Sequence, residues 1–245
     1  MIEIKHLSKT FQMKDGAVNA LSDINLTIPD GSIYGIIGMS GAGKSTLVRC
    51  INLLERPTEG SVVIDGTAME TLSPAALRER RRDITMIFQH FNLLMQKNVI
   101  DNICFPLQIQ GVKKKEARAK ARELLKTVGL EEKEKAYPAQ LSGGQKQLLN
   151  LASVMVTQPK ALILDEPSSN LDPEAEHRLF EELRKLTAGK TVLFTSHRLS
   201  NVSLADRIVV LEHGVVLEDG TREALLQQRG RFAELFQYQK EHFET

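Results

Sequence analysis

Two kinds of hydrophobic pattern alternate along the chain. Short apolar runs rich in β-branched residues and bounded by Gly, Pro or Asp are typical of β-strands. They occur at residues 2–7, 20–28, 32–37, 61–64, 83–88, 161–164, 191–195, 207–211 and 215–217. Apolar residues that recur every three or four positions predict helices. These lie at residues 44–54, 74–82, 113–128, 143–156, 173–186, 199–205 and 222–239. Strands that alternate with helices indicate an α/β fold with a largely parallel sheet.

The strand pattern disappears between Phe91 and Gln158, where helical patterns dominate. We therefore expect one domain over residues 1–245, with a core formed by 1–90 and 159–245. Residues 91–158 are expected to form a helical subdomain inserted into that core.

Composition and charge exclude several classes of protein and of site. The 245 residues are 42% hydrophobic and 26% charged, as is typical of globular proteins. The formal net charge of +1 gives no electrostatic case for a nucleic-acid partner. Cys50 and Cys104 lie far apart, which predicts neither a disulfide framework nor a zinc site. No apolar run approaches the roughly 18 residues that span a bilayer. We expect a soluble protein, or one that meets a membrane through another subunit.

The segment GMSGAGKST is a complete match to the phosphate-binding P-loop pattern. The apolar strand SIYGII precedes it and the helical start LVRCINLL follows it. The glycines let backbone N–H groups surround a triphosphate, and Lys44 adds a charge for the β- and γ-phosphate oxygens. Ser45 is expected to bind Mg²⁺. A glycine-rich turn without function would not require Lys and Ser at this register. The expected nucleotide-binding residues are Gly38, Met39, Ser40, Gly41, Ala42, Gly43, Lys44, Ser45 and Thr46.

A second acidic element follows the apolar strand at residues 161–164, which ends in Asp165 and Glu166. Such a strand delivers both carboxylates to the carboxyl edge of a parallel sheet. We expect Asp165 to reach the hydration shell of Mg²⁺. Glu166 points to the other face and is expected to act as general base toward the attacking water. Acidic residues at strand ends are common, so this pair indicates a metal and general-base site only because the chain also has a P-loop.

The segment LSGGQ, formed by Leu141, Ser142, Gly143, Gly144 and Gln145, narrows the class further. Ser142 and Gln145 form the S-x-x-Q pattern of a helix capping box. A capping box does not require two glycines, which expose backbone N–H groups to an anion. Because the P-loop is already complete, this segment predicts a second phosphate-type site.

Together these motifs resemble the ATP-binding cassette (ABC) ATPases over essentially the whole chain. The resemblance implies an α/β fold with a P-loop NTPase core of the ABC ATPase type, an antiparallel β subdomain and an inserted helical subdomain. It also implies a head-to-tail homodimer or pseudo-dimer that binds ATP and Mg²⁺. In that dimer, LSGGQ of one subunit closes on the γ-phosphate held by the P-loop of the other.

Four more residues take roles from the resemblance. Phe11 matches the aromatic platform for adenine, and Gln89 the sensor of γ-phosphate and metal. Asp172 lies in the turn that links the two sites, and His197 matches the switch histidine on the γ-phosphate. Three of them have a structural alternative: core packing for Phe11, a polar strand end for Gln89, and a hydrogen-bonded loop histidine for His197. The apolar run at residues 91–95 is either core or part of the groove that accepts a coupling helix of the membrane subunit.

Residues 1–147 are similar to the ATPase subunits of bacterial methionine importers, notably in RRDITMIFQHFNLL and AYPAQLSGGQKQ. Leu148 and Ser153 stand where that family has arginines, so the helix after LSGGQ supports that loop without them. Residues 161–245 look more like exporter-type cassettes. We do not expect the C-terminal regulatory domain that is common in methionine-importer ATPases, and therefore expect no feedback by methionine.

The motifs therefore predict the energy-coupling ATPase subunit of an amino-acid importer, with methionine as the expected solute. Its permease subunits would be separate chains, and it would lie peripherally at the cytoplasmic face of the inner membrane. The alternatives are the nucleotide-binding domain of an exporter and a non-transport ABC ATPase. The latter class needs coiled-coil arms, a tandem cassette or basic extensions, none of which the sequence shows. Lys44, Asp165, Glu166 and His197 argue against a catalytically inactive cassette.

Overall fold

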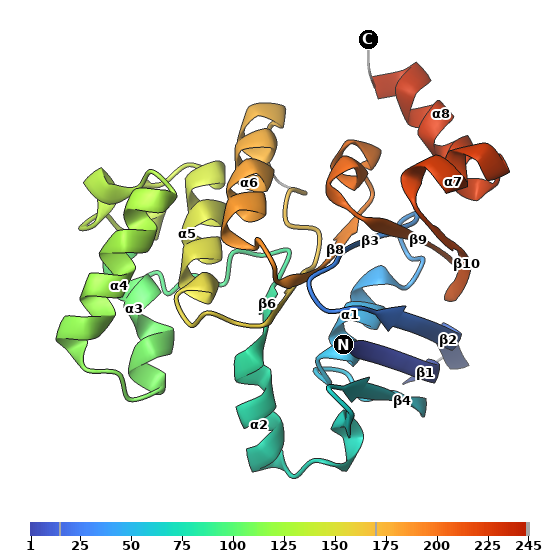
Figure 1. Cartoon of the computed structure of the whole chain (residues 1–245), viewed down its shortest axis with the longest axis horizontal. Coiled ribbons are helices and arrows are strands. Elements are labelled where there is room, and N and C mark those ends of the chain that lie inside the picture. The colour runs from blue at the N-terminus through green and yellow to red at the C-terminus, as the bar shows by residue number, and fades with distance from the viewer. Residues whose placement is uncertain (15, 170, 244–245) are drawn as a thin grey trace. The chain divides into compact units, whose positions relative to one another are not determined.

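The computed structural model describes residues 1–14, 16–169 and 171–243. The chain forms two compact units (Figure 1). Unit 1 comprises Met1–Arg81 and Gly189–Thr245, and unit 2 comprises Arg82–Ala188. The expected subdomain boundaries at residues 91 and 158 stay a prediction. No helix among the described residues is long and apolar enough to cross a membrane.

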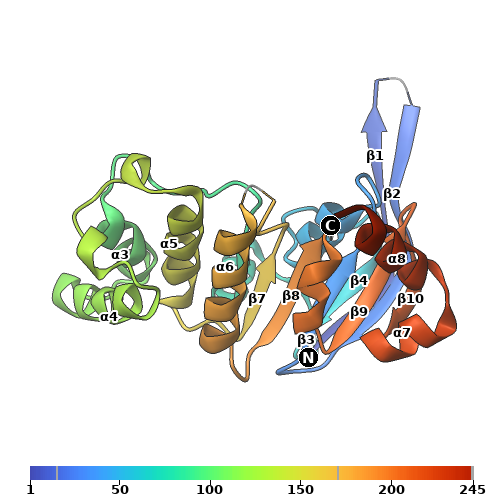
Figure 2. The same ribbon diagram turned by 90° about the horizontal axis from the view of Figure 1, so that it is seen from above.

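Unit 1 begins with an antiparallel sheet of four strands in the order β2-β1-β4-β5. Its strands are β1 (Ile2–Met13), β2 (Gly16–Ile28), β4 (Glu59–Ile64) and β5 (Thr67–Ala68). Ile2 pairs with Ile28 on one side and Ile64 on the other, so the central strand is β1. Alternate residues such as Ile2 and Ile4 are buried because successive side chains point to opposite faces. Beyond this sheet, β1 and β2 continue as a long hairpin (Figure 2).

The second sheet of unit 1 carries the glycine-rich loop and His197. Parallel pairs join β3 (Ile33–Ile37) to both β8 (Thr191–Ser196) and β9 (Arg207–Glu212), and β10 (Val215–Gly220) runs antiparallel to β9. Nearly every residue of these three parallel strands is buried, as is typical of a sheet with both faces covered. The strand expectations for this region are confirmed. Helix α1 (Lys44–Ile51) follows β3 after the glycine-rich loop.

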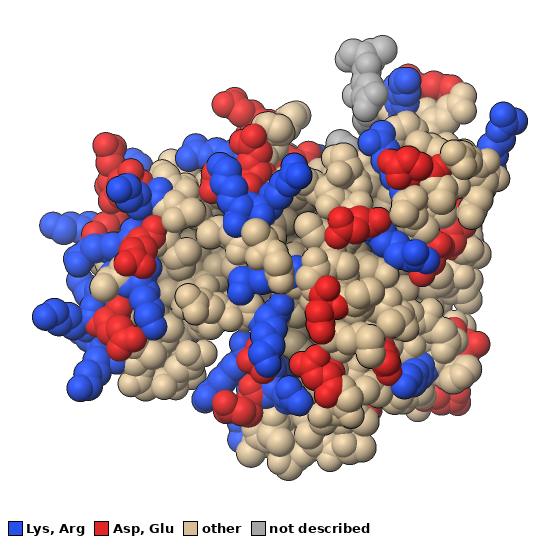
Figure 3. Space-filling view, in the orientation of Figure 1, with Lys and Arg blue, Asp and Glu red and all other residues tan. Residues whose placement is uncertain are grey.

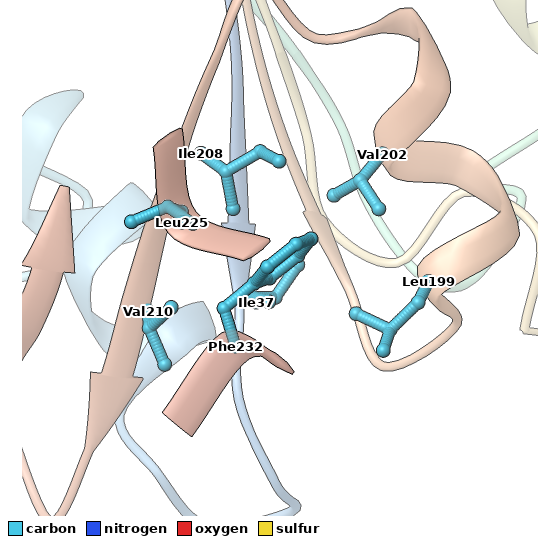
Figure 4. Packing of buried hydrophobic residues seen from close by; sticks show 7 residues of the cluster. All are labelled: Ile37, Leu199, Val202, Ile208, Val210, Leu225 and Phe232. Carbon is cyan, nitrogen blue, oxygen red and sulfur yellow. The ribbon is translucent and has the colours of Figure 1, made fainter. Parts of the chain in front are cut away.

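The C-terminal part of unit 1 differs from expectation. The single helix expected at residues 222–239 is two helices, α7 (Arg222–Gln228) and α8 (Arg231–Phe243). Arg229 ends α7 in the left-handed conformation (φ 53°), and Gly230 follows it. The helix expected at residues 199–205 is a 3₁₀ helix, Leu199–Leu204. Phe232 of α8 is fully buried, and Figure 4 shows it among Leu199, Val202, Ile208, Val210 and Leu225.

The described residues of unit 2 form one parallel strand pair and four α-helices that lie wholly within the unit. The pair is β6 (Ile84–Ile87) and β7 (Ala161–Leu164), with Ile84 opposite Ala161 and Ile87 opposite Leu164. The helices are α3 (Val99–Ile109), α4 (Lys114–Thr127), α5 (Gly143–Met155) and α6 (Pro173–Leu186). Three of them pack together, because α3 contacts both α4 and α5 (Figures 1 and 2). Short 3₁₀ helices lie at Met69–Thr71 in unit 1 and at Glu131–Lys133 and Pro138–Gln140 in unit 2.

Sequence patterns correctly predicted α4, α5 and α6, and also α2 (Pro74–Asp83), which precedes β6. They missed α3. This helix contains Pro106 and is buried around much of its circumference, so its apolar residues show no clear helical stripe. On the face shown in Figure 3, basic and acidic side chains are interspersed, as the balanced composition predicts.

Candidate functional site

The glycine-rich segment is a loop between β3 and α1, which confirms the strand, loop and helix order. Two of its glycines are required by close backbone contacts. A Cβ atom on Gly38 would lie 2.2 Å from the carbonyl oxygen of Leu211 in β9. A Cβ atom on Gly43 would lie 2.6 Å from the carbonyl oxygen of Ala20 in β2. Gly43 also has a φ of +105°, which side-chain-bearing residues rarely adopt. The loop is therefore held between two strands of unit 1.

Lys44 places its charge inside this loop. Its Nζ donates to the carbonyl oxygens of Gly38 (2.8 Å) and Met39 (3.1 Å), and the residue is only 4% exposed. Among the described residues, no side chain caps the N-terminus of α1, which begins at Lys44. The N–H groups of a first helical turn have no partner within the helix and favour an anion. The positive charge of Lys44 and the N-terminus of α1, which both favour an anion, therefore lie at the same end of this helix.

The other residues of the glycine-rich segment differ in their exposure to solvent. Met39, Ser40 and Gly41 are exposed at its tip, whereas Ser45 and Thr46 are half-buried in the first turn of α1. Ala42 is buried, and its carbonyl oxygen accepts from the N–H of Gly214 (3.1 Å) in the turn between β9 and β10. This bond ties the loop to the neighbouring strands.

Phe11 lies on the β1–β2 hairpin, opposite Val18. Its side chain is half-buried, so it is not a core residue. The Lys9 Nζ lies 4.7 Å from the centroid of the Phe11 ring, within the range of a cation–π contact. One face of the ring is therefore covered by a cation.

The acidic strand end lies in unit 2. All four residues of β7 are buried, and Asp165, which follows the strand, is 0% exposed. The backbone N–H of Asp165 donates to the carbonyl oxygen of Ile87 (2.8 Å), which extends the pairing of β7 with β6. Glu166 is half-buried and has a φ of +47°. A non-glycine residue in this region costs about 1–3 kcal/mol. Other non-glycine residues, such as Asp65 and His213, share this conformation, so it does not by itself mark a functional site.

Gln89 lies at the same strand edge as the two carboxylates. The register pairs Ile87 with Leu164, so Gln89 is two residues beyond β6 and Asp165 one residue beyond β7. Gln89 is exposed. The structure therefore brings an amide and two carboxylates to the carboxyl ends of two adjacent parallel strands, and the sequence predicted this edge for the two carboxylates.

The LSGGQ segment also lies in unit 2, where Leu141 is buried and α5 begins directly after Ser142. The predicted capping box is confirmed. The Ser142 hydroxyl accepts from the N–H of Gln145 (3.2 Å), and the Gln145 Oε1 accepts from the N–H of Ser142 (3.0 Å). These side chains therefore orient the first turn of α5, which contains Gly143 and Gly144.

Gly144 has a packing role that sequence reasoning missed. A Cβ atom there would lie 2.8 Å from the Cβ of Ala175 in α6, so glycine permits the close approach of α5 and α6. Asp172 caps α6, because its carboxylate accepts from the N–H of Ala175 (2.8 Å). Asp172 therefore positions the helix against which the LSGGQ helix packs.

Leu148 and Ser153 stand at the two positions where the resembled family has arginines. Leu148 is buried on α5, and the Ser153 hydroxyl donates to the carbonyl oxygen of Leu149 (2.8 Å). Both side chains are accommodated within α5 and its packing.

His197 follows β8 in unit 1, and its side chain is exposed. Its carbonyl oxygen accepts from the Nε2 of Gln239 (2.6 Å). Sequence reasoning missed Gln239, since nothing in an amphipathic C-terminal helix marks one polar residue as a partner of a loop 42 residues away. The P-loop, Phe11 and His197 thus belong to unit 1, whereas Gln89, LSGGQ, Asp165, Glu166 and Asp172 belong to unit 2.

Comparison with protein families matches residues 21–169 to the family described as ABC transporter. Methionine import ATP-binding protein MetN 1 of Burkholderia pseudomallei and MetN 2 of Lactiplantibacillus plantarum are each 48% identical over 223 residues. The match covers 90% of this chain but 65% of each relative. Among solved structures, the dimeric ATP-binding cassette MJ0796, in a post-hydrolysis state with ADP and phosphate, matches at a TM-score of 0.84. It is 34% identical, and the match covers 90% of this chain and 98% of MJ0796. The fold, the P-loop and these matches show that the chain belongs to the ABC transporter family, as an ATP-binding domain.

Proposed function

We propose that this chain hydrolyses ATP as the energy-coupling subunit of a membrane importer for methionine or a similar amino acid. The observation that carries the proposal is the P-loop with Lys44 inside it, in a chain that has a second glycine-bearing helix start at LSGGQ. The names of the relatives, methionine import ATP-binding proteins, support the choice of solute.

The P-loop binds the triphosphate of ATP in this proposal. The N–H groups at the start of α1 and the Lys44 ammonium face the β- and γ-phosphate oxygens. Adenine stacks on the face of Phe11 opposite Lys9, since Lys9 covers the other face. His197 contacts the γ-phosphate from the end of β8.

The residues proposed for Mg²⁺ are Ser45, Gln89 and Asp165, whose side chains offer the oxygen ligands that this ion prefers. Among the described residues, no group of three or more His, Cys, Asp or Glu side chains could hold a metal alone. Bound Mg²⁺ would neutralise charge that develops on the phosphates.

Glu166 accepts the proton of the attacking water. As the water oxygen bonds to the γ-phosphorus, the bond to the ADP oxygen breaks and the proton passes to the carboxylate. Glu166 directly follows Asp165 at the end of β7, at the strand edge where Gln89 also lies.

The second phosphate-type site requires a second subunit. LSGGQ of one subunit would complete the nucleotide site at the P-loop of its partner, in a head-to-tail dimer. MJ0796 is dimeric in its solved structure, which supports this assembly.

Cross-linking tests the composite site. Met39 is 58% exposed and Ser142 is exposed, whereas the native Cys50 and Cys104 are buried. A Met39→Cys chain mixed with a Ser142→Cys chain should form a cross-linked dimer with ATP, measured by gel electrophoresis. Without nucleotide the dimer band should be absent. A doubly substituted chain that cross-links only within itself would contradict the shared site.

A permease subunit is the expected membrane partner, so the chain would lie peripherally at the cytoplasmic face of the inner membrane. The run at residues 91–95 provides a surface for it. Leu93 and Leu94 are half-buried and Met95 is 52% exposed, so part of the run is accessible to a partner. Asn102 fixes its backbone, because the carboxamide bonds both the N–H (2.8 Å) and the carbonyl oxygen (3.1 Å) of Leu94.

We expect Leu94→Asp to abolish co-purification with the permease from detergent-solubilised membranes. ATP hydrolysis by the isolated chain should change by less than about twofold, because Asn102 bonds the backbone and not the side chain of Leu94. Ile109→Asp, at an apolar residue that is 65% exposed, is the matched control and should still co-purify. Loss of nucleotide binding in Leu94→Asp would instead indicate core packing.

A further inference from the structure

The Gln239 side chain of helix α8 bonds the loop that carries His197. The Nε2 of Gln239 donates to the carbonyl oxygen of His197 (2.6 Å), and its Oε1 accepts from the N–H of Leu199 (2.8 Å). One carboxamide therefore bonds the main chain on both sides of Arg198. The bonds connect positions 42 and 40 residues apart, within unit 1.

The start of the loop is held separately at the end of β8. The Ser196 hydroxyl accepts from the N–H of Arg198 (2.9 Å) and donates to its carbonyl oxygen (2.9 Å). The Asn201 Nδ2 bonds the same hydroxyl (3.4 Å), and both residues are buried. These short-range bonds shape the turn, whereas Gln239 ties it to a separate element.

Helix α8 is itself firmly anchored. The Glu218 carboxylate of β10 accepts from the N–H groups of Arg231 (2.5 Å) and Phe232 (3.0 Å) at its first turn. Phe232 is 0% exposed in the cluster of Figure 4, and Phe236 packs on it with ring centroids 6.0 Å apart. Gln239 lies two turns beyond Phe232, so a fixed helix presents its carboxamide to the loop.

We propose that Gln239 is a positioning residue for ATP hydrolysis. It holds the main chain of His197, so that the His197 side chain keeps the direction needed at the γ-phosphate. The inference rests on the role of His197 in the proposed function. Glutamine suits the position because its side chain both donates and accepts. Methionine of similar length can replace neither bond, and glutamate can replace only the one to Leu199.

Gln239→Met should lower the kcat of ATP hydrolysis by about 5- to 50-fold, through the two lost hydrogen bonds. The KM for ATP and the affinity for MgATP should stay within about twofold, because Gln239 does not contact nucleotide in this proposal. The Leu199 amide should lose about 10-fold or more of its protection from hydrogen exchange. Gln237→Met is the matched control, since Gln237 is exposed on α8 and bonds Glu241. It should leave kcat unchanged.

A double variant separates positioning from general stability. In a His197→Ala chain, Gln239→Met should cause no further loss of kcat, because the side chain it orients is gone. Gln239→Glu should keep the Leu199 amide protected yet still lower kcat. Losses that multiply in the double variant, or an unchanged kcat in Gln239→Met, would overturn the inference. If His197→Ala hydrolyses ATP as fast as the parent, the role of His197 in the proposed function fails instead.

Discussion

Replacing Glu166 with Gln is expected to lower the rate of ATP hydrolysis by roughly 10²- to 10⁴-fold, the usual contribution of a general base. Glutamine has nearly the same shape and the same backbone limits, so the strained conformation at φ +47° should persist. It cannot accept the proton of the attacking water at neutral pH. Phosphate release under saturating MgATP measures the rate, and nucleotide titration should show that ATP still binds.

The same variant should accumulate as an ATP-bound dimer, because the step that releases the dimer is blocked. Light scattering should report twice the mass of the ATP-free chain. Glu181→Gln is the matched control, since Glu181 is exposed on α6. It should hydrolyse ATP at the parental rate. A Glu166→Gln chain as fast as its parent would remove Glu166 from the mechanism.

Lys44→Met should weaken MgATP binding by about 10- to 150-fold, the range for one hydrogen bond to a charged group. Methionine keeps the unbranched stem but has no donor for the phosphates. It also removes the two bonds by which Nζ holds the carbonyl oxygens of Gly38 and Met39. Isothermal titration calorimetry measures the affinity, and circular dichroism verifies the fold.

Lys5→Met serves as the control for Lys44→Met, because Lys5 is an exposed lysine on β1 of the same unit. It should bind MgATP as the parent does. Unchanged affinity in Lys44→Met would mean that the triphosphate does not lie at the P-loop.

The elements and contacts that sequence reasoning predicted are local. The P-loop context follows from an apolar run, the glycines and a helical start that are contiguous in the chain. The capping box of α5 involves residues three apart, and its two hydrogen bonds have the expected form. Asp165 and Glu166 lie where a buried strand ends. Each of these features depends on neighbours within about one helical turn or one strand.

What was missed depends on distant partners or on burial. The break at Arg229 and Gly230 lies where the carboxylate of Glu218 bonds the start of α8, which a continuous helical pattern does not reveal. Helix α3 is buried around much of its circumference and therefore lacks the periodicity that marks a surface helix.

Residue types and spacing along the chain thus determined the order of most strands and helices, and they predict which residues bind phosphate and metal and which acts as general base. Only the packing of the folded chain decided two other features. Residue 144 must be glycine because Ala175 lies against it, and Gln239 bonds the loop that carries His197. The reason is physical. Propensity, capping and turn formation act over a few residues, whereas these two contacts form only after segments far apart in sequence are brought together by burial of apolar surface.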